Sequence, residues 1–156
     1  MARRRMTDPP DMEAFRKMLK AKSMNVTEQR LSVHAVMMQL IHASADMVCE
    51  RLAAQHPETP VTTASVYNIL SQLSDAGIYA RRMSAGNKMF FDIFAYPHAH
   101  LYDVRNHEFH DMIDDELRAL LEKHFRGRRF RGYHIDGIDV QLVCHPTRKN
   151  SKHFPK

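Results

Sequence analysis

Cysteine is scarce in this chain. Only Cys49 and Cys144 occur among the 156 residues, far apart and without a Cys-x-x-Cys pair, so a disulfide framework and a zinc site of four thiolates are both excluded. Long apolar runs are missing as well, since none approaches the roughly 20 residues that a membrane helix requires. The basic N-terminus has no apolar segment behind it, which is not the pattern of a signal peptide. We therefore expect a cytoplasmic protein that does not enter a membrane.

Acidic residues are the minority among the charged ones. The chain has 18 Asp and Glu against 23 Lys and Arg, which gives a net charge of +5. The positive surplus is clustered at residues 3–5, 126–131 and 148–156, and such clusters favour a polyanionic partner. Solvated termini and a basic loop are the alternative explanation, which we prefer for the C-terminal tail. With 44% hydrophobic residues, the chain is typical of a globular protein with one domain or two small ones.

Helical periodicity dominates the first half of the chain. Apolar residues at helical spacing predict four helices: one over residues 11–22, one after an N-cap at Thr27, one after an N-cap at Ser44, and one that starts at Thr62 or Thr63 and ends at Gly77. Two strands, at 78–82 and 88–94, are predicted on either side of a turn at 84–87. Helices followed by a β-hairpin are typical of a winged helix.

The second half changes character. Residues 100–104, 108–112 and 138–144 are strand candidates, the last with the alternation of a half-buried strand, and residues 114–125 predict a helix. A unit of about 55 residues is marginal alone, so we expect it to complete its core by dimerising. The predicted fold class is α+β: a winged-helix DNA-binding domain with a basic N-terminal arm (1–94), then a small α/β dimerisation domain with a basic C-terminal tail (95–156).

The fourth predicted helix has the surface of a DNA reader. Its apolar stripe leaves small hydroxyl and amide side chains on the opposite face: Thr63, Ser65, Tyr67, Asn68, Ser71 and Gln72. Such groups near a helix N-terminus suit contacts with phosphates and base edges in a major groove. An ordinary amphipathic helix with a polar outside is the alternative, because polar helix faces are common.

A possible metal site follows the hairpin. Asp92 ends an apolar strand, and His98 and His100 lie two residues apart, so both can project from the same face of the next strand. Imidazole and carboxylate ligands without thiolate suit Fe(II), Mn(II) or Zn(II). The pattern therefore predicts a site for a divalent metal.

Three segments resemble the ferric uptake regulator (Fur) family: VTEQR at 26–30, ASVYNIL at 64–70 and DAG at 75–77. The resemblance spans about residues 14–144 and implies a homodimeric winged-helix regulator, a repressor type, that binds a palindromic DNA operator. Tyr67 matches the family's DNA-contacting tyrosine, and Arg30 is included among the DNA contacts. Asn68 stands where the family often has Arg, and this form resembles the iron response regulator (Irr) subgroup.

The same resemblance implies a fuller ligand set. One regulatory divalent metal per subunit (Fe²⁺, Mn²⁺ or Zn²⁺) would be held by His42, Asp92, His98, His100 and Asp111. His42 opens the segment HASAD, which is similar to a family motif. The ion would bridge the DNA-binding and dimerisation domains and so control DNA binding.

Other metal positions of the family are missing. Asp103 and Asn106 stand where the family has the Cys-x-x-Cys of a structural zinc, and Pro97, Ala99 and Ile138 stand at a second site. The Irr subgroup often has three consecutive histidines associated with haem. Pro97-His98-Ala99-His100 breaks that run, which argues against haem.

Two rival functions are compatible with part of the pattern. Two histidines and a carboxylate could hold the metal of a non-haem enzyme, but no nucleophile constellation or glycine-rich cofactor loop accompanies them, so we predict no enzymatic activity. A metal-independent winged-helix module with incidental histidines is the second rival.

Overall fold

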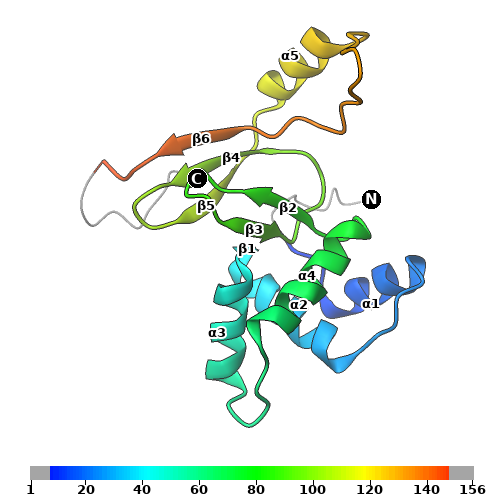
Figure 1. Ribbon diagram of the computed structural model, residues 1–156, viewed down its shortest axis with the longest axis vertical. Coiled ribbons are helices and arrows are strands. Elements are labelled where there is room, and N and C mark those ends of the chain that lie inside the picture. Colours follow the sequence, from blue (N-terminus) through cyan, green and yellow to red (C-terminus); the bar gives the residue numbers. More distant parts are fainter. Residues whose placement is uncertain (1–7, 148–156) are drawn as a thin grey trace. The chain divides into compact units, whose positions relative to one another are not determined.

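The computed structural model describes residues 8–147. The chain divides into two compact units, Met1–Tyr96 (unit 1) and Pro97–Lys156 (unit 2), drawn in Figure 1. The predicted basic arm at 3–5 and basic tail at 148–156 lie outside the described residues. In the part of the chain that is described, no helix combines the length and the apolar character needed to cross a membrane.

Unit 1 contains four helices whose starts are fixed by side-chain caps. The helices are α1 (Met12–Ala21), α2 (Glu28–Leu40), α3 (Ala45–Gln55) and α4 (Thr63–Asp75). Their caps are Asp11, Thr27, Ser44 and Thr62, and each cap oxygen accepts a hydrogen bond from the backbone N–H three residues later. The expected caps at Thr27 and Ser44 are confirmed, and Thr62 rather than Thr63 caps α4.

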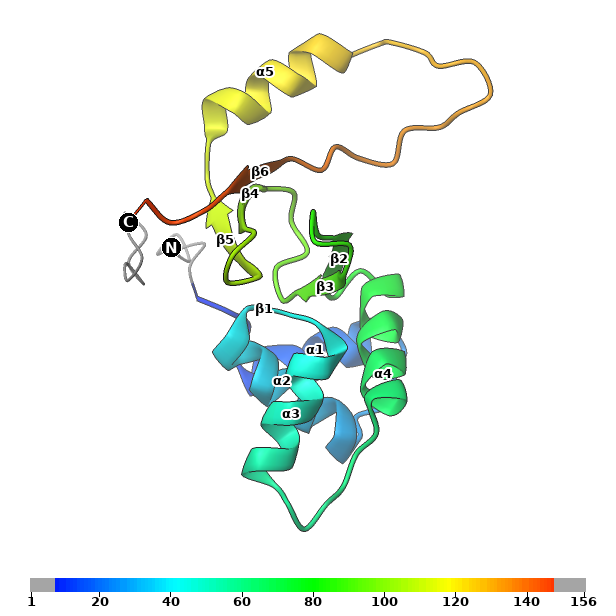
Figure 2. The same ribbon diagram turned by 60° about the vertical axis from the view of Figure 1, so that its left-hand side comes forward.

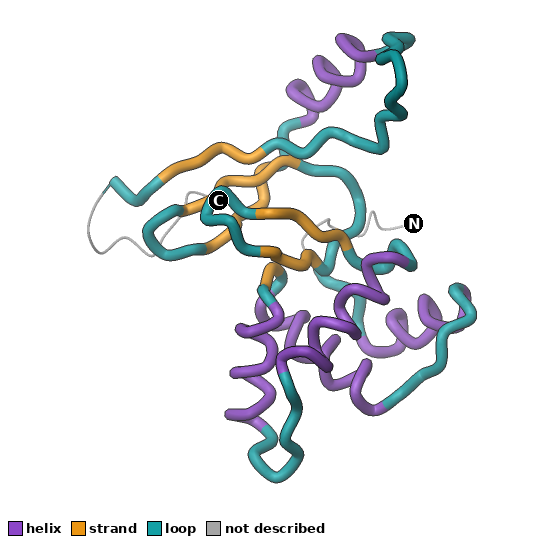
Figure 3. The backbone as a smooth tube through the Cα atoms, in the orientation of Figure 1, coloured by secondary structure: helices purple, strands orange, loops and turns teal. Residues whose placement is uncertain are grey.

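A small antiparallel sheet completes unit 1, and Figure 3 shows its strands in orange. The strands are β1 (His42–Ala43), β2 (Ala80–Met83) and β3 (Met89–Asp92), in the order β1-β3-β2. The expected hairpin joins β2 to β3, and the Asn87 N–H donates to the Ser84 carbonyl at 2.9 Å in its turn. The sequence did not predict β1, a two-residue strand without periodicity.

The core of unit 1 lies between the helices and the sheet. Its fully buried side chains include Phe15, Leu19, Met37, Leu70, Leu73 and Phe91. His34 belongs to this core: its ring stacks on Phe15 at 3.9 Å, its Nδ1 lies 2.7 Å from the Tyr79 hydroxyl, and its Nε2 lies 2.7 Å from the Pro10 carbonyl. This network ties the segment before α1, through α2, to the residue that precedes β2.

Unit 2 has a three-stranded sheet and one helix. Its elements are β4 (Ala99–Asp103), β5 (Glu108–Met112), α5 (Asp115–Phe125) and β6 (Gln141–Cys144), and the sheet order is β5-β4-β6. β5 pairs antiparallel and β6 parallel with β4. Figure 2 shows α5 leading away from this sheet and a long loop returning to β6.

The prediction for the last strand was partly wrong. The strand starts at Gln141 rather than near residue 138, and Ile138 and Leu142, which the alternation places on the buried face, are exposed. No residue of α5 is buried either. The alternation of apolar residues is real, but among residues 8–147 no element packs over this surface.

Candidate metal and DNA-binding residues

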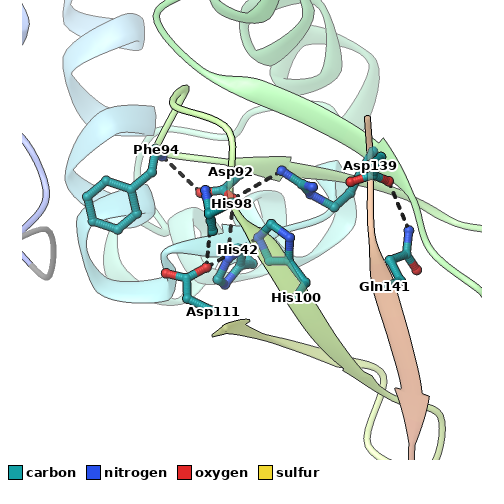
Figure 4. A network of polar contacts seen from close by, with 9 residues as sticks. His42, Asp92, Phe94, His98, His100, Asp111, Asp139 and Gln141 are labelled. Carbon is teal, nitrogen blue, oxygen red and sulfur yellow. Dashed lines mark hydrogen bonds and ion pairs between the residues drawn. The ribbon is translucent and has the colours of Figure 1, made fainter. Parts of the chain in front are cut away.

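His42 and Asp92 face each other across two paired strands. They are register partners in β1 and β3, and the His42 Nε2 lies 3.4 Å from the Asp92 Oδ2 (Figure 4). Directly opposite residues of an antiparallel pair have neighbouring side chains. The two-residue strand β1 therefore places an imidazole beside the carboxylate that ends β3. We name this arrangement the first His–Asp pair.

The backbone turns sharply just before His42. Ile41 caps the C-terminus of α2 with φ +63°, a left-handed conformation that is strained for a β-branched residue. Its N–H donates to the Met37 carbonyl at 2.8 Å, and its carbonyl accepts from the Ile93 N–H at 3.0 Å. These two hydrogen bonds hold the turn between α2 and β1, and so they fix the position of His42 at the start of β1.

A half-buried arginine also lies beside Asp92. The Nη2 of Arg82 is 3.4 Å from the Asp92 Oδ2, and the Asp92 Oδ1 accepts from the Phe94 N–H at 2.9 Å. Arg82 is paired with Phe90, so Asp92 is its diagonal neighbour across the hairpin. Arg82 was not predicted, although this spacing around the 84–87 turn is the signal that would have placed it near Asp92.

Unit 2 contains a second cluster of the same chemistry. His98 immediately precedes β4, and His100 lies within it as the register partner of Asp111 on β5. The Asp111 Oδ1 is 2.8 Å from the His98 Nε2 and 3.2 Å from the His100 Nε2 (Figure 4). Two imidazole nitrogens thus converge on one carboxylate oxygen. We name His98, His100 and Asp111 the histidine cluster of unit 2.

The donors in both places fit a divalent cation. Each place offers imidazole nitrogen and carboxylate oxygen, the ligand types taken by Fe(II), Mn(II) and Zn(II). His42, Asp92 and His100 are buried, so little water surrounds their donor atoms. A positive ion would neutralise the buried Asp92 carboxylate, which is costly to keep charged in such surroundings. Two nearby histidines of unit 2, His107 and His110, do not join either cluster.

The outer face of α4 presents polar groups in unit 1. Thr63, Tyr67, Asn68 and Gln72 are exposed, and Ser65 is half-buried. The Tyr67 ring stands edge-on to Phe91 with centroids 5.8 Å apart. A core residue of the sheet thus orients this tyrosine while leaving it 42% exposed.

The two other predicted DNA contacts, Arg30 and Ser71, differ in their surroundings. Arg30 donates to the Asn25 carbonyl at 2.6 Å and to the Gln72 side chain at 2.9 Å, which links the start of α2 to α4. The Ser71 hydroxyl is buried without a hydrogen-bond partner. Because this hydroxyl is not accessible, Ser71 is not among the DNA contacts that we propose.

The turn between β4 and β5 is closed by Asp103. Its Oδ1 accepts from the N–H groups of Arg105 and Asn106 at 2.8 and 3.2 Å, and its Oδ2 accepts from the Asn106 side chain at 2.7 Å. Burial alone would raise the pKa of Asp103, but these hydrogen bonds outweigh it, and the pKa is lowered. Asp103 and Asn106, which stand where the resemblance would place a Cys-x-x-Cys, thus bind each other.

Comparison with known proteins agrees with the architecture. The model of the ferric uptake regulator family matches residues 21–141. The ferric uptake regulation protein of Haemophilus ducreyi is 31% identical over 117 residues, which cover 69% of this chain and 77% of that protein.

Two solved structures share the fold. The crystal structure of the Vibrio cholerae ferric uptake regulator has a TM-score of 0.68 at 23% identity and covers 85% of this chain and 99% of that one. The Pseudomonas aeruginosa regulator, solved with manganese, has a TM-score of 0.65 at 22% identity, with 85% and 98% covered. The chain belongs to the ferric uptake regulator family of metal-responsive, DNA-binding transcriptional regulators and is not an enzyme.

Proposed function

We propose that residues 1–94 form the winged-helix domain that reads a DNA operator through α4, and that residues 95–156 form the dimerisation domain. The exposed polar face of α4 supports the first half of this proposal. Thr63 and Ser65 lie in the first turn of α4, and the N-terminus of a helix attracts phosphate. Tyr67, Asn68 and Gln72 continue the same face, and Arg30 is anchored to it through Gln72.

The regulatory ligand is one divalent metal ion per subunit, held by His42, Asp92, His98, His100 and Asp111. The observation that carries this proposal is that each unit contributes its own cluster of imidazole and carboxylate, the first His–Asp pair and the histidine cluster of unit 2. One ion shared by the two would join the units. Iron, manganese and zinc all suit these donors, whereas a four-thiolate zinc site and haem are not part of the proposal.

Such an ion regulates by differential affinity. It must bind more tightly to the arrangement in which both clusters reach it than to any other, because equal affinity shifts no equilibrium. The ion supplies a crosslink, and no reaction takes place on it. Ordering the two units would set where α4 stands in a dimer, and therefore whether two copies of α4 meet two half-sites of a palindrome.

The homodimer is supported by the exposed apolar side chains of unit 2. They lie on α5, on the loop that follows it and on β6: Leu120, Phe125, Phe130, Tyr133, Ile135, Ile138, Leu142 and Val143. β6 is also an edge strand of its sheet. Exposed apolar surface on this scale in a small unit is typical of a subunit interface. We place this dimer in the cytoplasm, where an operator is accessible.

The double variant His98→Ala/Asp111→Asn tests the metal site. It removes one nitrogen and one charged oxygen donor while His100 keeps the buried position. We expect the metal content after dialysis, measured by mass spectrometry, to fall from about one ion per subunit to a small fraction. The matched control is His134→Ala/Asp136→Asn, a His–Asp pair at 3.9 Å that is fully exposed, and it should retain the wild-type content.

Operator binding with and without chelator then separates the proposal from its rival. Wild type and the control should respond to the chelator, and His98→Ala/Asp111→Asn should not. Full metal content in that variant would overturn the ligand assignment. Chelator-insensitive operator binding by metal-loaded wild type would instead support a metal-independent module.

A further inference from the structure

A basic loop follows α5, and the function proposed above uses its exposed aromatic side chains but not its arginines. We name residues 125–133 the arginine loop. It contains Arg126, Arg128, Arg129 and Arg131, and no acidic residue. The loop therefore carries a charge of +4, whereas the whole chain carries a net charge of +5. Every residue of the loop is exposed.

The backbone of the arginine loop is folded rather than extended. The Arg128 N–H donates to the Phe125 carbonyl at 3.1 Å, and the Tyr133 N–H donates to the Phe130 carbonyl at 3.0 Å. Gly127 and Gly132 have φ of +73° and +81°, and no atom lies within 4 Å of where a Cβ would be. Glycine is needed here for the turn and not for space. Two tight turns therefore display the arginines at fixed places along the loop.

Aromatic side chains support these turns from within the loop. The rings of Phe125 and Phe130 have centroids 6.5 Å apart, and the Arg128 guanidinium lies 6.0 Å from the Phe125 centroid. A guanidinium over an aromatic face gains cation–π attraction without losing its hydrogen-bond donors. The aromatic residues thus shape the loop and leave the arginines available.

The charge of the loop is not neutralised within the described residues. None of its four arginines has a carboxylate within ion-pair distance there, whereas Arg118 on the preceding helix pairs with Glu122 at 3.2 Å. Four uncompensated guanidinium groups within six residues repel one another. That cost is relieved when a polyanion binds, and a planar guanidinium matches the oxygens of a phosphate.

We infer that the arginine loop is a second DNA-binding surface, which contacts backbone phosphates of the duplex outside the base pairs read by α4. The inference rests on the proposed function only in that the chain binds DNA. Duplex DNA offers one phosphate charge per about 1.7 Å of helix axis, so several arginines of one short loop can be satisfied together. Phosphate contacts add affinity and salt dependence but no sequence preference.

The salt dependence of operator affinity tests this inference. The variant Arg128→Gln/Arg129→Gln removes two charges from the loop, and Arg118→Gln/Lys123→Gln removes two exposed charges from the neighbouring helix. The dimeric protein is titrated onto a long operator duplex and onto one trimmed to the operator, between roughly 50 and 200 mM salt. On the long duplex the slope of log K against log salt should become less steep by about 0.9 for each phosphate that the variant no longer binds. We expect this for the loop variant only.

On the trimmed duplex the two variants and wild type should have similar slopes, because the flanking phosphates are gone. Equal slopes for both variants on the long duplex would overturn the inference, since charge alone would then explain the effect. A loop variant that sediments as a monomer would also overturn it, because Arg128 and Arg129 would then be subunit contacts rather than DNA contacts. An unchanged slope for the loop variant on the long duplex, together with loss of binding to phosphatidylglycerol vesicles or to RNA, would overturn the inference too. The loop would then bind a membrane or RNA instead of duplex DNA. A failure of the proposed function is distinguishable: wild type would then show no preference for the operator on either duplex.

Discussion

Tyr67 combines an exposed hydroxyl with a ring oriented by the core. Because Phe91 fixes the ring edge-on, the hydroxyl of Tyr67 is presented at a defined place on α4. We predict that Tyr67→Ala weakens operator binding about tenfold, or about 1.4 kcal/mol, without changing metal content. Fluorescence anisotropy at one fixed salt concentration measures this. Tyr67→Phe loses only the hydroxyl, so its operator affinity should lie between those of wild type and Tyr67→Ala. Wild-type affinity in Tyr67→Ala would contradict the role of α4.

The stability of unit 1 depends on pH through His34. Burial lowers the pKa of His34, and the Pro10 carbonyl and Asp11 only partly oppose this. Since the pKa in the folded state is below the unfolded value of about 6.5, the unfolded chain binds the proton more readily. The contribution of neutral His34 to stability is therefore present above about pH 6.5 and is lost as the pH falls toward the folded-state pKa.

Urea unfolding at about pH 7.5 and about pH 5 checks this expectation. The unfolding midpoint of wild type should drop more between the two pH values than that of His34→Gln, which cannot titrate there. The comparison isolates His34 from the other ten histidines, which both proteins share. Equal drops would show that His34 is not responsible.

At the level of elements, the start of α4 depends on one threonine. The Thr62 Oγ1 accepts from the Ser65 N–H at 3.1 Å, whereas Thr63 is already the first helical residue. We predict that Thr62→Ala lowers the free energy of unfolding by about 1 kcal/mol and that Thr63→Ala has little effect. Chemical denaturation of the two variants side by side is the measurement. Equal losses would mean that the cap is not at Thr62.

The helices were predictable because their signals are local. Thr27 and Ser44 stand at the N-caps where the sequence places them, and Gly77 follows the end of α4 with the expected positive φ. The hairpin was predictable for the same reason. β1 was not, because two residues have no period, and its pairing with β3 depends on the strained turn at Ile41.

The candidate metal ligands divide in the same way. Asp92, His98 and His100 follow from a strand end and a two-residue spacing. His42 and Asp111 came only from the family resemblance, because their positions depend on the register of paired strands. The bounds of β6 and the exposure of α5 could not be predicted from the sequence, since their apolar faces find no partner in the part of the chain that the structure describes.

For the whole molecule, the exposed apolar side chains of unit 2 predict a concentration-dependent dimer. Leu142 is 48% exposed on the edge strand β6, and we predict that Leu142→Asp shifts the protein toward monomer, since it would bury an unpaired charge at the interface. Thr59→Asp, which introduces the same charge on an exposed turn of unit 1, should leave the dimer intact. Analytical ultracentrifugation over a range of concentrations compares them, and a dimeric Leu142→Asp would place the interface elsewhere.

The Asp103 turn has a consequence for how this protein folds. Hydrogen bonds from Arg105 and Asn106 form as the chain folds and require nothing from the medium, whereas a thiolate knuckle folds only once zinc has been supplied. Closure of the Asp103 turn therefore needs no zinc. In this metal-responsive protein, the folding of the turn is independent of the kind of ligand to which the protein responds.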